Sequence, residues 1–189
     1  MKRGELGESL NLSVEIIPEG RPNRPGTPIT IRKITVHNTS NTDRGANASS
    51  HSSWVRNTGY YLYRGRKNWV SWHYTVDDRE VIKQLPIAEK GWHAGSGNSQ
   101  SIGIEICMHQ GIDQAKAFDR AARLIAALLY DLNMSIEDVV THKYWTGKNC
   151  PILLLDPQGW QNFTQNIQLY LSGIYESNSN AEGDDDDDV

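Results

Sequence analysis

The chain has 189 residues, of which 38% are hydrophobic and 22% are charged. This length and composition suit one compact domain and argue against a wholly disordered chain. The formal net charge is −4, but six acidic side chains lie within the last eight residues, and without them the charge is +2. A nearly neutral body argues against a dedicated nucleic-acid binder, which carries a strong basic excess.

The two ends of the chain differ from its middle in composition. Residues 1–30 contain Pro18, Pro22, Pro25 and Pro28, so we expect an extended N-terminal segment that wraps the domain. They hold no apolar block of the kind found in a signal peptide, and no run of the chain approaches the roughly 18 apolar residues of a membrane span. Residues 173–189 are predicted to form an acidic, disordered tail. The domain itself is expected to span residues 31–172.

The first half of this domain contains several β-type segments. A β-branched run at 34–36 predicts a buried strand that ends in His37 and Asn38. Residues 46–63 are compatible with a helix whose end Gly59 weakens, and residues 64–68 form a basic turn. Residues 69–76 have strong β composition, Asp77 and Asp78 mark a turn, and residues 80–85 form the returning strand of a hairpin.

The second half alternates strands with helices. Residues 91–100 are rich in Gly, Ser and Asn and predict a loop that faces a site, whereas residues 101–107 alternate with the period of a strand. An apolar stripe over 114–132 predicts a helix. Residues 139–142 predict a further strand, and a last helix is expected to begin near Asp156 and Pro157. We therefore predict an α/β fold in which helices pack on a mixed central sheet.

Three side chains suit a metal site. His37 and His142 each lie at the C-terminal end of a predicted buried strand, and Cys150 comes eight positions after His142. Two imidazoles and one thiolate suit zinc, with a fourth position left open for water. The chain has neither a CxxC pair nor an HExxH helix, so spacing alone leaves the alternative of two packing histidines and a buried thiol.

Glu105 lies within a strand whose other face is all isoleucine. A carboxylate there is costly to bury without a partner. It either forms an ion pair with Lys or Arg, or acts as a general base beside a metal. Cys107 shares its face, and we expect a buried free thiol there rather than a fourth ligand or a disulfide partner for Cys150.

Four segments in order resemble the zinc-dependent N-acetylmuramoyl-L-alanine amidase family. They are ITVHNTSN at 34–41, SWHYTVDD at 71–78, GWHAGSGNSQSIGIEIC at 91–107 and THKYWTGKNCP at 141–151. This type-2 amidase group shares its fold with peptidoglycan recognition proteins, and the chain is most similar to the amidase domains of endolysins. The resemblance covers residues 30–172 and implies a mixed central β-sheet flanked by helices.

The resemblance also implies roles for individual residues. His37, His142 and Cys150 match the ligands of one zinc ion per chain, Glu105 matches the glutamate that activates water, and Lys148 matches a lysine that stabilises the oxyanion. His73 and His93 match positions that line the substrate groove. The aromatic residues between 60 and 72, Trp72 among them, are numerous enough to suggest a surface on which sugar or peptide stacks, although half of them suit the core better. Arg64, Arg66 and Lys67 are either a receptor for a stem-peptide carboxylate or a solvated turn.

The implied activity is hydrolysis of the amide bond between N-acetylmuramic acid and L-alanine. The expected partner is peptidoglycan or a muropeptide, bound by a monomer that interacts with neither nucleic acid nor the membrane interior. We expect the protein to be made in the cytoplasm and to act on the cell wall after holin-type release or lysis. One alternative is a non-catalytic muropeptide-binding module, but non-catalytic relatives lose the cysteine ligand that Cys150 supplies here. Another is a cysteine-nucleophile hydrolase, which Pro151 directly after Cys150 disfavours.

Overall fold

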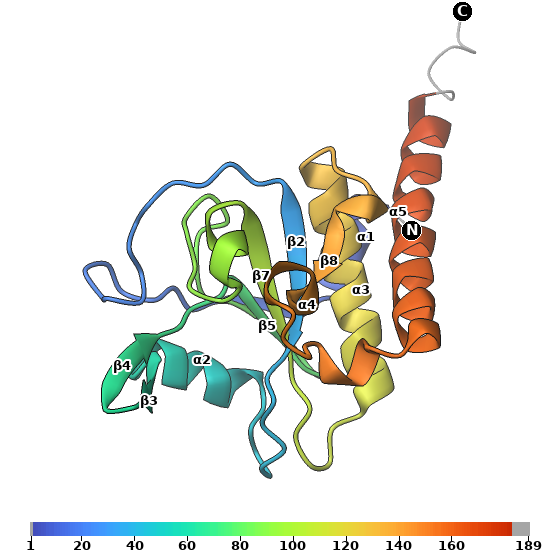
Figure 1. The fold of residues 1–189 in the computed structure, drawn as a ribbon. Coiled ribbons are helices and arrows are strands. Elements are labelled where there is room, and N and C mark those ends of the chain that lie inside the picture. Colours follow the sequence, from blue (N-terminus) through green and yellow to red (C-terminus); the bar gives the residue numbers. More distant parts are fainter. Residues whose placement is uncertain (1, 183–189) are drawn as a thin grey trace, which may run out of the picture.

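The computed structural model describes residues 2–182 and is built around a six-stranded sheet (Figure 1). Its strand order is β1-β6-β5-β7-β2-β8, and every neighbouring pair is parallel except β5 and β6. This confirms the predicted mixed sheet and the predicted hairpin, whose turn contains Asp77. The strands are β1 (Leu12–Val14), β2 (Lys33–Asn38), β5 (Tyr74–Val76), β6 (Val81–Lys83), β7 (Ser101–Ile106) and β8 (Val139–Thr141).

The alternation in β7 separates the core from the site. Ile102, Ile104 and Ile106 are fully buried in the main hydrophobic cluster. Because side chains alternate along a strand, Gly103 and Glu105 lie on the opposite face of the sheet. The parallel register between β2 and β7 places His37 beside Glu105. A single pattern thus supplies both a core face and a polar face.

Two long helices lie together on the core side of the sheet (Figure 1). The first, α3 (Gln114–Asp131), begins at Asp113, whose carboxylate accepts a hydrogen bond from the Lys116 N–H. The second, α5 (Pro157–Glu182), packs along α3. Short 3₁₀ turns at Ile136–Asp138 and Ile152–Leu154 precede β8 and α5 respectively. Both helices confirm the predicted starting points.

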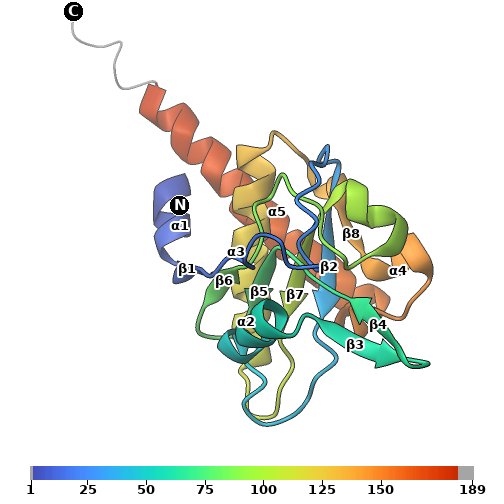
Figure 2. The ribbon, with the colours of Figure 1, turned by 90° about the vertical axis from the view of Figure 1, so that its left-hand side faces the viewer.

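The other face carries a shorter helix and a separate two-stranded hairpin (Figures 1 and 2). The predicted helix over 46–63 is wrong at its end: α2 (Ala48–Asn57) stops, and β3 (Tyr60–Tyr63) pairs with β4 (Arg66–Trp69). Gly59 has φ +65°, and a Cβ there would lie 2.1 Å from the Asn23 side chain. The predicted turn over 64–68 and the predicted strand over 69–76 also have wrong bounds, since β4 covers 66–69 and β5 covers only 74–76. Only Arg64 and Gly65 turn, both at positive φ, which suits a two-residue hairpin loop.

The prediction that the whole N-terminal segment is extended is wrong for its first part. It begins with a helix, α1 (Arg3–Glu8), whose Leu6 is fully buried against Ala127 and Ile174. It then adds β1 to the edge of the sheet. The first proline is Pro18, so no proline interrupts the preceding residues, and the burial of Leu6 favours the helix in spite of Gly4 and Gly7. This part of residues 1–30 therefore belongs to the domain.

The C-terminal boundary also differs from the prediction. Disorder was expected for residues 173–189, yet α5 continues to Glu182, and Ile174 within it is fully buried. Burial of this apolar side chain outweighs the polar composition that follows it. Residues 183–189, which include the aspartate run, lie outside the described residues. Among the described helices, none is long and apolar enough to cross a membrane.

Candidate functional site

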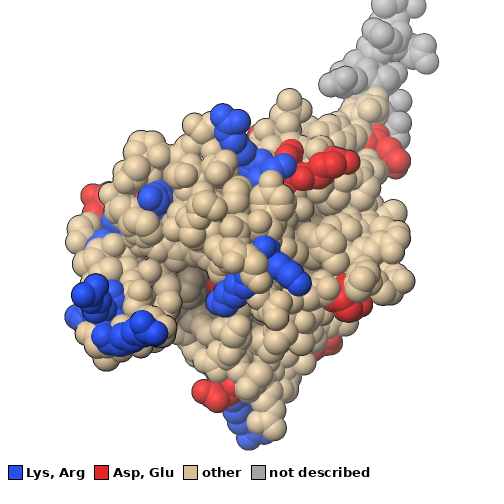
Figure 3. Space-filling view, viewed as in Figure 1, with Lys and Arg blue, Asp and Glu red and all other residues tan. Residues whose placement is uncertain are grey.

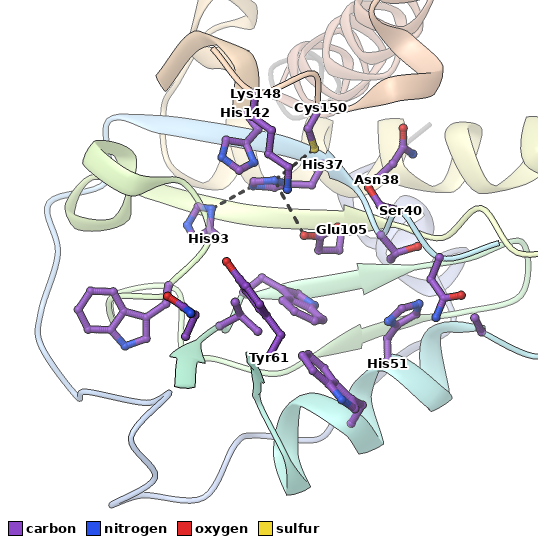
Figure 4. Close-up of a pocket in the computed structure, with 18 of the residues that line it drawn as sticks. His37, Asn38, Ser40, His51, Tyr61, His93, Glu105, His142, Lys148 and Cys150 are labelled. Carbon is purple, nitrogen blue, oxygen red and sulfur yellow. Dashed lines mark hydrogen bonds and ion pairs between the residues drawn. The ribbon is translucent and has the colours of Figure 1, made fainter. Parts of the chain in front are cut away.

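The three predicted metal ligands converge above the polar face of the sheet. His37 lies near the end of β2, and His142 is the first residue of a short helix, α4 (His142–Thr146), that directly follows β8. Cys150 comes from the loop after α4. One potential ligand atom from each of the three side chains lies within 4.8 Å of the others, and all three side chains are buried (Figure 4).

The chemistry of this trio fits a metal ion. His37 Nδ1 lies 3.7 Å from Cys150 Sγ, and a tetrahedral zinc would separate a nitrogen and a sulfur ligand by about 3.6 Å. His142 Nδ1 is buried and has no hydrogen-bond partner among the described residues. Cys150 forms no disulfide, and neither does Cys107, which is a buried free thiol as predicted.

The imidazoles are held in the neutral form that binds metals. Burial lowers the pKa of His37 well below its ordinary value, and neighbouring His93 and His142 add to this. Burial likewise lowers the pKa of His142 to about 4. The pKa of the Cys150 thiol is raised to about 11, chiefly by burial and then by Glu105. A bound cation would offset this cost by stabilising the thiolate.

Glu105 lies directly beside the trio. Its Oε1 is 3.9 Å from His37 Nδ1, and its Oε2 is buried without a hydrogen-bond partner among the described residues. Burial raises its pKa to about 8, although the Lys148 charge opposes this. No lysine or arginine of the described chain forms an ion pair with it. The ion-pair alternative is therefore wrong, and a carboxylate with a free oxygen faces the site.

Lys148 lines the same cavity as the trio. Its side chain is drawn reaching into the cavity above His37 (Figure 4), which it lines together with Glu105. Its positive charge adds to the lowering of the His142 pKa by burial, and it opposes the rise that burial causes in the pKa values of Glu105 and Cys150. The structure thus brings together all five residues predicted for metal binding and catalysis.

These residues line one part of a cavity of about 1020 Å³. The hollow lies between the body and the β3–β4 hairpin, over which basic side chains gather (Figure 3). Trp72 is among the lining residues but is only 6% exposed. It packs in a cluster with Ile17, Val55 and Leu85, and its ring stacks on Trp54 with centroids 6.4 Å apart. Tyr61 and Lys67 line the hairpin side. The cavity therefore offers aromatic and cationic surface beside the metal ligands.

The two remaining histidines of the motifs have different positions. His93 lines the cavity, as predicted, and its Nδ1 lies 3.0 Å from His37 Nε2. His73 is fully buried and does not line the cavity. Its Nδ1 accepts a hydrogen bond from the Gly103 N–H, and its Nε2 donates to the Glu89 carbonyl. The structure thus places His73 beneath the site and not in the wall of the cavity.

His73 provides a test of acid stability in the metal-free chain. Burial lowers its pKa to about 4, so between about pH 6.5 and pH 4 the unfolded chain binds a proton that the folded chain does not. The free energy of unfolding should therefore fall on acidification by about 1.4 kcal/mol per pH unit through this residue. The free energy of unfolding, measured with urea at pH 4.5, 5.5 and 6.5, should fall less steeply with acidification in His73→Gln than in wild type, by about that amount per pH unit. An identical slope in the variant contradicts this account.

Other cavity residues were not recognised in the sequence. His51 and Trp54, one turn apart on α2, both line the cavity. Trp145 lies next to the site without lining the cavity. Its Nε1–H donates a hydrogen bond to Thr35 Oγ1, and its ring packs on Gly97. Three-residue spacing between His51 and Trp54 places them on one helix face, which is the signal that could have indicated them.

Comparisons with known proteins agree with this geometry. Residues 25–152 match the family of N-acetylmuramoyl-L-alanine amidases. N-acetylmuramoyl-L-alanine amidase XlyA of Bacillus subtilis (strain 168) is 46% identical over 162 residues, which are 84% of this chain and 51% of XlyA. The chain thus spans about half the length of that relative.

Solved structures are similar over the same region. The catalytic domain of XlyA superposes with a TM-score of 0.76 at 46% identity, covering 84% of this chain and 99% of that domain. A mutant endolysin from Bacillus subtilis gives a TM-score of 0.76 at 45% identity, with the same coverage. The match thus covers nearly all of that solved domain, and the expected type-2 amidase-like fold is confirmed.

Proposed function

The chain belongs to the N-acetylmuramoyl-L-alanine amidase family, and from this premise we propose that it hydrolyses the amide bond between N-acetylmuramic acid and L-alanine in peptidoglycan. One observation carries the proposal: a buried carboxylate with a free oxygen lies beside two histidines and a cysteine that can share one metal ion. These groups open onto a cavity large enough for a sugar and several amino acids.

We propose that the metal is zinc, held by His37, His142 and Cys150. The donor set supports this choice, because zinc accepts nitrogen and sulfur ligands together and tolerates an open fourth position. When bound, zinc would polarise the scissile carbonyl and make water more acidic. The neutral imidazoles and the single buried thiol prepare the chain for such an ion.

Glu105 is proposed to move the proton. Its unpartnered oxygen faces the site, so Glu105 in its ionised form can accept a proton from the attacking water. The same carboxyl group, once protonated, can deliver that proton to the departing amine of L-alanine. An amine leaves poorly unless it is protonated, so both halves of this shuttle lower the barrier.

Lys148 is proposed to stabilise the negative charge that develops on the carbonyl oxygen. Because that charge grows only toward the transition state, Lys148→Ala should lower kcat by about 10–100-fold with less than about threefold change in KM. Steady-state kinetics on soluble muropeptide would measure both. Lys143→Ala is the matched control, since Lys143 is exposed on α4 and does not line the cavity. A variant changed in KM alone would contradict the oxyanion role.

The groove beyond the metal is proposed to receive the glycan and stem peptide. Aromatic rings of Trp54, Trp69 and Tyr61 line it, and such rings bind sugar faces. Lys67 lines the same wall and is placed to meet a carboxylate of the peptide. His93 is proposed to contribute to this wall as well as to the contact described below.

The site of action is proposed to be the cell wall. The similar endolysin structure supports this assignment, and release by lysis or through a holin-type pore would bring the chain to its substrate. Monomeric action is part of the same proposal, because one chain supplies every residue of the site.

The activity is tested by digesting purified peptidoglycan and measuring newly released amino groups of L-alanine. We expect release by the zinc-loaded protein and none after chelation, with recovery on adding zinc. Binding to walls without release would indicate a recognition module. Release that survives removal of the metal would instead indicate a cysteine nucleophile.

A further inference from the structure

His37 can bind a metal only through a nitrogen that carries no proton. Its Nδ1 faces the site, at 3.7 Å from Cys150 Sγ and 3.9 Å from Glu105 Oε1. Its Nε2 faces away, at 3.0 Å from His93 Nδ1 (Figure 4). A neutral imidazole carries its proton on one nitrogen or the other. The group that fixes the proton on Nδ1 or on Nε2 therefore decides whether Nδ1 of His37 can bind a metal.

A backbone carbonyl that contacts His93 fixes the position of this proton. His93 Nε2 lies 3.3 Å from the Ser101 carbonyl oxygen, which can only accept a hydrogen bond. His93 Nε2 therefore carries the proton, and His93 Nδ1 is left as an acceptor. His37 Nε2, at 3.0 Å from this acceptor, must then carry a proton to donate a hydrogen bond to it. His37 Nδ1 is then unprotonated and faces Cys150.

The position of the His93 ring depends on Gly103. A Cβ at residue 103 would lie 2.7 Å from His93 Nδ1 and 2.8 Å from the ring carbon Cγ. Residue 103 lies in a central strand, opposite Thr35 of β2, so its backbone has little freedom to retreat. The loop that carries His93 is fixed from the other side, because Asn98 Oδ1 accepts hydrogen bonds from the N–H groups of His93 and Ala94.

We infer that His93 is a positioning residue that holds the proton of His37 on Nε2, and that Gly103 provides the space this requires. The inference rests on the proposed metal site and adds a residue that controls it. Metal-binding histidines usually donate their second N–H directly to a carboxylate, a backbone carbonyl or water. Here a second imidazole lies between the ligand and the Ser101 carbonyl.

The proton positions can be read in the wild-type chain without any substitution. A long-range ¹H–¹⁵N correlation spectrum of the metal-free protein at neutral pH distinguishes protonated from bare ring nitrogens. We expect His37 and His93 both to carry the proton on Nε2. A proton on Nδ1 of His37 would overturn the inference, whatever the activity of the enzyme.

The consequence for the metal is measured as zinc affinity, by competition with a chromophoric chelator on the full chain. His93→Leu removes both hydrogen bonds at similar volume and should weaken zinc binding by about 10–100-fold. His93→Gln keeps an acceptor and a donor and should recover most of that loss. A His93→Leu protein that binds zinc within about twofold of wild type would overturn the inference.

Gly103 supplies an independent arm through a double-substitution cycle. Gly103→Ala should weaken zinc binding in the wild-type background but have little further effect in a His93→Ala background, where residue 93 has no atom beyond Cβ to meet the new methyl group. Gly4→Ala is the matched control, since a Cβ there meets nothing within 4 Å. Additive losses would show that Gly103 does not act through His93. Failure of the wild-type chain itself to bind zinc would refute the proposed metal site instead.

Discussion

Glu105→Gln should lower turnover by at least about 100-fold while the protein still binds one zinc ion. Glutamine keeps the size of the side chain but cannot accept and return a proton, and proton transfer of this kind contributes about 10²–10⁴-fold. Rates of L-alanine amino-group release and zinc content by elemental analysis would be measured on the same sample. Glu8→Gln, at an exposed glutamate of α1, is the control for the chemical change. A Glu105→Gln enzyme with wild-type turnover would remove the proton-shuttle role.

The same substitution should stabilise the metal-free chain at alkaline pH. The pKa of Glu105 is raised to about 8 by burial, so between about pH 4.5 and pH 8 the folded chain holds a proton that the unfolded chain has lost. Stability contributed by this group is present below pH 4.5 and is lost as pH rises through 8. Urea unfolding at pH 9 should therefore show Glu105→Gln more stable than wild type by a few kcal/mol. Equal stability at pH 9 would contradict the burial of an uncompensated carboxylate.

Cys150→Ala should abolish zinc binding and, with it, at least about 1000-fold of the activity. The substitution removes the only sulfur of the trio and leaves two imidazoles, which are too few to hold zinc tightly. Cys107→Ala is a matched control, because Cys107 is an equally buried free thiol that lies directly after β7. It packs against Ala48 and Ile82 and not against the trio. Loss of zinc in Cys107→Ala, with retention in Cys150→Ala, would reverse the assignment.

Local patterns predicted the elements whose burial repeats regularly. The isoleucines of β7 alternate with Gly103 and Glu105, and α3 carries an apolar stripe, so periodicity alone was sufficient. The segment 46–69 was divided wrongly because its tyrosines suit a helix end and a strand equally well. Contact between Gly59 and Asn23, distant in sequence, decides between them.

The site could be predicted in part for a similar reason. His37 and His142 follow strands that the sequence marks as buried, and in parallel strands such ends meet at one edge of the sheet. The short helix α4, which begins at His142, has too few residues to show a period. The interior position of His73 and the contact between His93 and His37 depend on register between strands, which no local pattern specifies.

Zinc K-edge X-ray absorption on the loaded protein will show whether two imidazoles and one thiolate share one zinc ion. We predict a first shell with one sulfur at about 2.3 Å and two nitrogens at about 2.0–2.1 Å, completed by a light atom from water. A shell without sulfur, or with two sulfurs, would contradict the account.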